Sequence, residues 1–465
     1  MSRQLLHDAA SYAADFLERL PSRSVGAPAG AAQLRAALDG PLPVEPIEPA
    51  EVVAALAEGV EPGAVGIPGR RYFGFVIGGA LPAALAADWL TSTWDQNAGL
   101  FAAGPAASIV EEVAGRWLID LLALPPLASF AFVTGCQMAN FTALAAARNA
   151  VLGAAGWDVE DRGLVGAPPI RVLVGAERHI TVDRALRYLG LGRAALEVVP
   201  ADAQGRMRPE ELETALAGTD GPTIVCAQAG NVNTGAFDPV ADICDLAHAT
   251  GAWVHVDGAF GLWARCSPKL AHLAPGIERA DSWATDGHKM LNVPYDSGIA
   301  LCAHPAAHRA AMSVHASYLV HEGEGGERDE MDWTPEFSRR ARGFAIYAAL
   351  RALGRRGVEA MVERCCSHAQ RFTAHLSGSP LAEVLNDVVF NQVLVRLRSG
   401  DGDDDAFTRR VVSAVQADGT CWLSGSEWQG KAVMRISVSN WSTTEEDVDR
   451  SAAVILRIAS EQRHS

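Results

Sequence analysis

Short apolar runs alternate with helical patterns along the middle of the chain, from about Ser129 to Ala303. Most of these runs are rich in β-branched or aromatic residues and are apolar on both faces, as is typical of a sheet that helices cover on both sides. The pattern predicts an α/β domain with a mostly parallel, seven-stranded sheet. The expected strands are Phe130–Thr134, Ile170–Val174, Leu196–Val199, Thr223–Ala227, Trp253–Asp257, Ser282–Thr285 and Gly298–Cys302.

The regions on either side of this sheet have different patterns. Proline-rich stretches separate an amphipathic N-terminal helix from the layer that leads into the sheet, and a long helical pattern, about Pro335–Leu376, follows it. We expect an N-terminal helical segment in residues 1–70, a large α/β domain in residues 71–335, and a linker helix with a small α+β domain in residues 336–465. The strands of the small domain are expected at Gln392–Leu397, Cys421–Leu423 and Val433–Val438.

Composition narrows the class of protein. The 465 residues carry a formal net charge of −16, which disfavours binding to nucleic acid or to an anionic membrane surface. Neither a signal peptide nor an apolar stretch long enough to cross a bilayer is visible, so we expect a cytoplasmic protein. The eight cysteines form no CxxC pair and are expected to be reduced, buried thiols, and no metal site is expected.

Two candidate site elements each follow a predicted strand. In VTGCQMANF, a tight turn at Gly135 and Cys136 precedes an Ala-rich helix, whose first backbone N–H groups would suit a phosphate. Gly135 would let the backbone approach a ligand closely. His179 follows the next strand, where open α/β sheets bind ligands, and could stack there on an aromatic cofactor. Helix capping is the alternative role for His179.

Two further elements lie closer to the C-terminus of the sheet region. Asp257 ends the strand in WVHVDGAFG, where a carboxylate can hold the proton of a pyridinium ring. Ala259 is small enough to pack flat against such a ring. Lys289 lies between two strands, and a lysine near cationic or apolar neighbours can form a Schiff base. His288 beside it could contact phosphate, so the four elements together form one constellation.

With this constellation the chain resembles the group II amino-acid decarboxylases that depend on pyridoxal 5′-phosphate (PLP). That family has the fold of aspartate aminotransferase (fold type I) and includes the aromatic L-amino-acid, glutamate and diaminobutyrate decarboxylases. The resemblance runs over nearly the whole chain. It also includes RYFGFVIGGALPAALAADWLTSTWDQNAG, the segment GNVNTGAFDP at 230–239 and SRRARGFAIYAALRALG at 338–354.

The resemblance implies a role for each candidate residue. Lys289 would bind PLP covalently, and Asp257 would pair with its pyridine nitrogen. His179 would stack on one face of the ring, with Ala259 opposite. A homodimer is implied as well, with active sites at the subunit interface and N-terminal helices around the partner. The remaining cofactor contacts would be Gly135 and Cys136 through backbone N–H groups, His288 at the phosphate, and Asn231 near Asp257.

The sequence departs from the family at three places, one of which is Met290, where the family commonly has Trp after the lysine. The phosphate turn reads T-G-C-Q-M-A-N where the family usually has S-G-G-S/T-E-A-N, so some helpful side chains are missing while backbone donors remain. Aromatic decarboxylases also carry, three residues before a Trp, a loop Tyr that protonates Cα. Here that Trp matches Trp333, the position holds Glu330, and the loop His321–Asp332 contains no Tyr. The candidate donors are His179, Tyr318 and Glu330, and the acidic, glycine-containing loop is expected to be exposed.

The expected activity is decarboxylation of an L-amino acid to CO₂ and an amine. Aromatic residues around Tyr72–Phe75 and Trp94 favour an aromatic or apolar substrate. The alternative is a cationic substrate, attracted by Asp95 or by the acidic loop. The missing loop Tyr leaves other PLP outcomes open, namely a decarboxylating oxidative deaminase, an aminotransferase or another carbon–carbon lyase. An alternative of another class is a non-catalytic dimerisation paralogue, which the presence of Lys289 and Asp257 disfavours.

Overall fold

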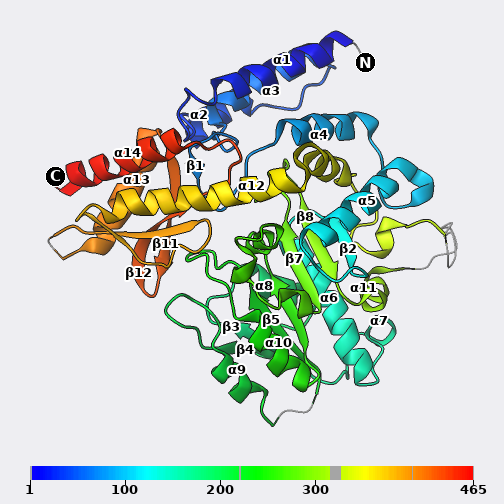
Figure 1. Cartoon of the computed structure of the whole chain (residues 1–465). Coiled ribbons are helices and arrows are strands. Elements are labelled where there is room, and N and C mark those ends of the chain that lie inside the picture. The colour runs from blue at the N-terminus through cyan, green and yellow to red at the C-terminus, as the bar shows by residue number, and fades with distance from the viewer. Residues whose placement is uncertain (1–2, 219–220, 315–325, 401, 464–465) are drawn as a thin grey trace. The chain divides into compact units, whose positions relative to one another are not determined.

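The computed structural model describes residues 3–218, 221–314, 326–400 and 402–463, and the chain divides into two compact units (Figure 1). The larger unit contains residues 80–369 and 386–393. The smaller unit contains the residues up to 79 together with residues 370–385 and those from 394 onward.

A seven-stranded sheet forms the centre of the larger unit, with the order β2-β8-β7-β6-β5-β3-β4. Strand β8 is antiparallel to both of its neighbours, and the pairs from β7 to β4 are parallel, so the predicted mostly parallel sheet is confirmed. The strands are β2 (Ser129–Val133), β3 (Arg171–Gly175), β4 (Leu196–Val199), β5 (Thr223–Gln228), β6 (Trp253–Asp257), β7 (Ser282–Asp286) and β8 (Gly298–Cys302).

Helices cover this sheet because its strands are apolar on both faces. Every residue of β2, β5, β6, β7 and β8 is buried. Helix α6 (Cys136–Ala154) packs across β6, β7 and β8, and its alanines allow close contact with the strands. The other helices of this unit are α4 (Pro82–Trp94), α5 (Pro105–Leu121), α7 (Val159–Arg162), α8 (Ile180–Tyr188), α9 (Pro209–Leu216), α10 (Val240–Ala249) and α11 (Pro305–Met312).

The smaller unit contains a five-stranded sheet with the order β1-β11-β12-β10-β9. Its edge strand β1 (Tyr72–Phe73) is parallel to β11 and is stabilised by Tyr72, which stacks on Trp422. Such a short strand leaves no periodic signal in the sequence. The other strands are β9 (Ala382–Val384), β10 (Gln392–Leu397), β11 (Trp422–Trp428) and β12 (Lys431–Ser437). The helices are α1 (Arg3–Arg19), α2 (Ala31–Leu38), α3 (Pro49–Val60), α13 (Asp404–Asp418) and α14 (Glu445–Arg463). Helix α12 (Gly343–Ser377) and the first two residues of β10 extend across the division between the units.

The structure shows the state of the cysteines and the character of the helices, on which composition raised expectations. All eight cysteines are buried and free, as expected. Among the described helices, none combines the length and the apolar character that a membrane span requires. The described residues also contain no group of three or more His, Cys, Asp or Glu side chains arranged to hold a metal ion.

Two fully buried histidines of the larger unit share one arrangement. His255 Nδ1 lies 3.0 Å from Ser282 Oγ, and His308 Nδ1 lies 2.8 Å from Ser129 Oγ. Burial lowers the pKa of His255 to about 4 and that of His308 to about 3. Both rings are therefore neutral near pH 7, whereas the unfolded chain can protonate them near their ordinary pKa of 6.5.

These histidines are expected to make the protein less stable in mild acid. Their lowered pKa values mean that the stabilisation is complete above pH 6.5 and is lost as pH falls toward the folded pKa, by about 1.4 kcal/mol per pH unit for each ring. Replacing His308 by glutamine should remove one such contribution. Thermal melts between pH 7 and pH 5 should show a Tm that falls less steeply for the variant than for the wild type. Parallel curves would contradict the prediction.

Candidate active site

The predicted site residues lie at one edge of the large sheet. The strands β2, β3, β5, β6 and β7 all end at this edge, because they run in the same direction. The chain segments that follow the ends of parallel strands build the ligand sites of open α/β folds. The structure places eight predicted residues in these segments: Gly135, Cys136, His179, Asn231, Asp257, Ala259, His288 and Lys289.

Lys289 is the least exposed lysine of the chain, with 18% of its side chain accessible to solvent. The sequence contains three lysines, and the other two, Lys269 and Lys431, are exposed. The Nζ atom of Lys289 lies 2.9 Å from Oδ2 of Asp286. Burial, the largest single effect, would lower the pKa of Lys289, but the charge and the hydrogen bond of Asp286, together with the charge of Asp257, raise that pKa above its ordinary value. The ammonium form is therefore held in place by a carboxylate.

Asp286 was not among the residues that the sequence singled out. It ends β7, and its Oδ1 atom accepts a hydrogen bond of 2.6 Å from the backbone N–H of Cys136. The same oxygen lies 3.3 Å from Nε2 of His288. An Asp-Gly pair that follows a strand is typical of a turn, so the sequence pattern does not indicate a site role for Asp286. Three predicted site residues thus meet at one unpredicted carboxylate.

His288 is held in a defined orientation and charge state. Its Nδ1 atom accepts a hydrogen bond of 3.1 Å from the backbone N–H of Ser297. Its ring stacks on Tyr295 with 4.2 Å between the ring centres. Burial lowers the pKa of His288, which favours the neutral ring. Because Nδ1 accepts, the hydrogen lies on Nε2 and points to Asp286.

Asp257 is surrounded by hydrogen-bond donors. Its Oδ1 atom accepts from the thiol of Cys136 at 3.4 Å and from the backbone N–H of Ala259 at 3.3 Å. Its Oδ2 atom accepts from Nδ2 of Asn140 at 3.3 Å. Burial and the two nearby carboxylates raise the pKa of Cys136 well above its ordinary value, so its sulfur remains a donor. These donors hold the Asp257 carboxylate in a defined orientation.

His179 caps helix α8 and also faces the site. Its Nδ1 atom accepts from the backbone N–H of Thr181 at 3.4 Å and lies 2.8 Å from the Thr181 hydroxyl. His179 and Asp257 line the same small cavity at the sheet edge. Asn231 does not line it; its Nδ2 atom donates to the carbonyl of Glu177 at 3.0 Å and so fixes the loop before His179.

The turn before α6 has the features that a bound phosphate needs. A Cβ atom added at Gly135 would lie 3.3 Å from Cε1 of His288, so glycine leaves room there. The side-chain amide of Gln137 is buried without a partner in the described chain, and so is the hydroxyl of Ser297. Buried polar atoms normally have partners, so these groups are suited to bind a ligand. The Cys136 N–H, in contrast, donates to Asp286 in this structure.

The expectation of an exposed loop is confirmed at Gly326 and Glu327 but is wrong for the residues that directly precede Trp333. Residues 321–325 and the candidate Tyr318 lie outside the described residues, but Glu330, Met331 and Asp332 are buried. Nε of Arg328 lies 3.0 and 2.9 Å from the two carboxylate oxygens of Glu330. A proton donor must reach the substrate, and Glu330 is instead committed to this ion pair. Charge alone suggested exposure, but ion pairing allows burial.

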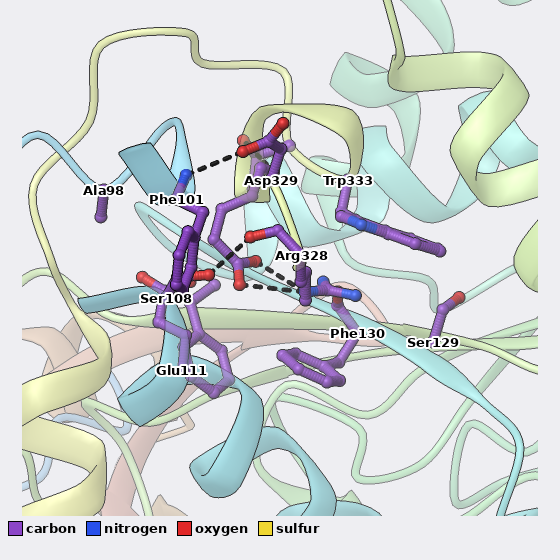
Figure 2. Close-up of polar contacts among 12 residues, drawn as sticks. Ala98, Phe101, Ser108, Glu111, Ser129, Phe130, Arg328, Asp329 and Trp333 are labelled. Carbon is purple, nitrogen blue, oxygen red and sulfur yellow. Dashed lines mark hydrogen bonds and ion pairs between the residues drawn. The ribbon is translucent and has the colours of Figure 1, made fainter. Parts of the chain in front are cut away.

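Arg328 fixes this segment to the large sheet. Its guanidinium lies between the rings of Phe130 and Trp333, 4.2 and 4.3 Å from their centres (Figure 2). It also donates to the carbonyl of Phe130 at 2.6 Å, while Asp329 accepts from the backbone N–H of Phe101 at 2.7 Å (Figure 2). Cation–π contacts and charged hydrogen bonds together hold the segment against β2.

A second buried ion pair lies beside the first. Nη1 of Arg339 is 2.8 Å from Oε1 of Glu111, and both side chains are inaccessible to solvent. Burial, the largest effect, raises the pKa of Glu111 to about 7. Arg339 also donates to the carbonyls of Ala98 and Phe132 at 2.7 and 2.6 Å. The SRR segment of the sequence therefore has a structural role in this protein.

Comparisons with known proteins agree with the geometry. A family model described as the pyridoxal-dependent decarboxylase conserved domain matches residues 42–398. An aromatic-L-amino-acid decarboxylase of Bacillus atrophaeus is 28% identical, with 99% of this chain and 95% of the relative covered. An L-2,4-diaminobutyrate decarboxylase of Rhizobium meliloti is 30% identical, with 80% and 74% covered. The crystal structure of Oryza sativa TDC with PLP and tryptamine is 25% identical, has a TM-score of 0.91, and is matched over 99% of this chain and 97% of that one.

Proposed function

Because the chain belongs to the family of pyridoxal-dependent decarboxylases, we propose that it decarboxylates an L-amino acid with PLP bound covalently to Lys289. The observation that carries this assignment of residues is the grouping of Lys289, Asp257 and His179 at one sheet edge. The cofactor, when bound, supplies an electron sink for the bond that breaks at Cα. The protein selects that bond by the way it holds the substrate.

Each residue of the site has a proposed task. Asp257, kept as a carboxylate by its donors, accepts the N–H of the pyridine ring. His179 covers one face of the ring and Ala259 the other. The N-terminal turn of α6 at Gly135 and Cys136 takes the phosphate, with His288 and the unpaired amide of Gln137 beside it. Gln137 thus supplies a donor in a turn where the sequence departs from the family.

The proposed substrate is an aromatic or apolar amino acid. Phe75 and Trp94 keep 56% and 49% of their surfaces exposed, whereas Tyr72 and Phe73 are buried in the smaller unit. Phe75 and Val76 both have positive φ angles, 54° and 57°, which is strained for side chains of this size. The aromatic-L-amino-acid decarboxylase among the relatives also supports this class.

His179 is the proposed proton donor to Cα. Glu330 is committed to Arg328, and His179 presents a ring at the site with its Nδ1 atom already accepting hydrogen bonds. A general acid at this step contributes about 10²–10⁴ in rate. The His179→Gln variant should therefore lose turnover while it still binds the cofactor.

The reaction outcome is tested by product balance. Purified protein with PLP is incubated with single amino acids, and CO₂, amine, ammonia and oxygen uptake are measured. Equal yields of CO₂ and amine, without ammonia or oxygen uptake, are expected. CO₂ and ammonia formed with oxygen uptake, in place of an amine, would indicate a decarboxylating oxidative deaminase. A keto acid formed without CO₂ would indicate transamination.

The Asp286→Asn variant is expected to load PLP faster near neutral pH. Lys289 must be a neutral amine to attack the cofactor, and the charge of Asp286 raises its pKa. Without that charge burial dominates and lowers the pKa, so the neutral fraction grows and loading shifts to lower pH. Mixing apoprotein with PLP between pH 6.5 and pH 9 and following absorbance measures this rate. Asp286→Glu keeps the charge, and an equal shift in that variant would contradict the explanation.

We also propose a cytoplasmic homodimer with active sites at the subunit interface. Helix α1 has no buried residue within this chain, although Leu6, Tyr12 and Leu17 are among its side chains. A helix with an uncovered apolar face is stabilised by packing against a partner. Light scattering on the purified protein should give twice the chain mass of 49.1 kDa, and a monomer that binds PLP and turns over would contradict the dimer.

A further inference from the structure

We propose that Asn140 is a positioning residue that joins Asp257 to His179 and, through a buried hydrogen-bond chain, holds both in the state that the cofactor requires. The inference rests on the proposed roles of Asp257 and His179. Asn140 lies in the second turn of α6 and is completely buried. Its role is not visible from the helical pattern, since an Asn within a helix reads as a neutral choice.

The orientation of the Asn140 amide follows from its neighbours. One side lies 3.3 Å from Oδ2 of Asp257, and a carboxylate can only accept hydrogen bonds, so this side is the NH₂ group. Its second hydrogen points to Oγ1 of Thr181 at 3.3 Å. The amide oxygen lies 2.9 Å from Nε2 of His255. Both hydrogens and the oxygen of the amide therefore have partners.

A chain of donors reaches Asn140 from the interior of the sheet. The amide oxygen accepts, so Nε2 of His255 carries the hydrogen. The ring is neutral because burial lowers its pKa, so Nδ1 accepts from the hydroxyl of Ser282 at 3.0 Å. Ser282 in turn accepts from the indole N–H of Trp253 at 2.9 Å. Every bond of the chain donates toward Asp257.

The second branch sets the tautomer of His179. The Thr181 hydroxyl accepts from Asn140 and so donates its own hydrogen to Nδ1 of His179, at 2.8 Å. The Thr181 backbone N–H also points to Nδ1. With two donors at Nδ1, the hydrogen of the neutral ring lies on Nε2. The Asn140 amide thus donates a hydrogen bond to Asp257 and, through Thr181, determines which nitrogen of His179 carries the hydrogen.

The consequence for the cofactor is a proton held at the pyridine nitrogen. Donors to Asp257 stabilise its charged form. A stabilised carboxylate leaves the shared proton on the ring nitrogen, where it is needed for electron withdrawal. Breaking this chain of hydrogen bonds should shift the proton from the ring nitrogen toward Asp257. Loss of one hydrogen bond to a charged group should also weaken PLP binding by about tenfold or more.

The chain offers a matched control for this idea. His308 is also buried and neutral, and it is paired with a serine in the same way, but its Nε2 atom lies 2.9 Å from the backbone carbonyl of Trp333. Replacing His308 by phenylalanine therefore disturbs the fold to a similar degree without a link to Asp257. His255→Phe breaks the proposed chain, and Asn140→Leu removes the branch point.

The test measures the protonation state of the pyridine nitrogen in PLP bound to each variant. Apoprotein of each variant is loaded with PLP labelled with ¹⁵N in the ring, the ¹⁵N chemical shift is recorded at pH 7.5, and the PLP Kd is measured by equilibrium dialysis. The shift should indicate a protonated nitrogen in the wild type and in His308→Phe. In His255→Phe and Asn140→Leu it should move toward the unprotonated value, with a Kd at least about tenfold higher.

Each other outcome has a defined meaning. A protonated nitrogen and a wild-type Kd in His255→Phe would overturn the proposal, and so would equal changes in His308→Phe. If His255→Phe does not fold, Ser282→Ala removes the donor one step further away and should produce the same change to a smaller extent; a wild-type result there also overturns the proposal. A wild type that binds no PLP would refute the proposed function together with this inference.

Discussion

The Lys289→Ala variant is expected to lose the absorbance of covalently bound PLP and to lose turnover by about three orders of magnitude or more. Lys289 is the largely enclosed lysine at the sheet edge, and its amine is the proposed nucleophile that forms the bond to the cofactor. Covalent attachment aligns the cofactor before substrate arrives, so the loss affects both binding and rate. Activity and absorption spectra of wild type and variant measure both effects.

The small number of lysines makes this test unusually direct. Borohydride reduction of the wild type followed by proteolysis and mass spectrometry should place PLP on the peptide with Lys289, and the other two possible positions are Lys269 and Lys431. Lys269 has 77% of its side chain exposed and pairs with Glu363, so Lys269→Ala is a control that should keep wild-type activity. Label on Lys269 or Lys431 would show that another lysine carries the cofactor.

The second large effect is expected from Asp257→Ala. This change removes the buried carboxylate that would pair with the pyridine nitrogen, and breaking a buried charged hydrogen bond costs about 2–5 kcal/mol. That corresponds to a loss in kcat of roughly 30-fold to several thousand-fold. Steady-state kinetics and the PLP Kd of the variant measure it.

A second substitution distinguishes charge from packing at this position. Asp257→Asn keeps the shape of the side chain but cannot stabilise a positive ring nitrogen, so it should be nearly as slow as Asp257→Ala. Asp257→Glu keeps the charge and should recover part of the rate. If Asn restored activity and Glu did not, the side chain would act through packing, and the proposed role of Asp257 in holding a proton would be wrong.

The acidic segment before Trp333 is less exposed than its sequence predicts. The segment before Trp333 is acidic, which predicted exposure, yet Glu330 and Asp332 are buried. Each is neutralised by an arginine, Arg328 and Arg309, whose partners sequence spacing cannot identify. Burial of a charge depends on whether the fold brings an opposite charge to it. The acidic composition of this segment therefore shows only that its burial is unfavourable. The fold makes burial possible because it brings an arginine to each buried carboxylate.

The sequence by itself determined the large sheet and the main residues at its edge. Strands buried on both faces must be apolar throughout, so all seven were visible, and the polar residues that follow them, such as His179, Asp257 and Lys289, were found by position. The tertiary structure alone decided that Asp286 binds Lys289 and that Asn140 joins Asp257 to His255. Asn140 and His255 are 115 residues apart, and a hydrogen bond between distant residues leaves no periodic trace in either segment.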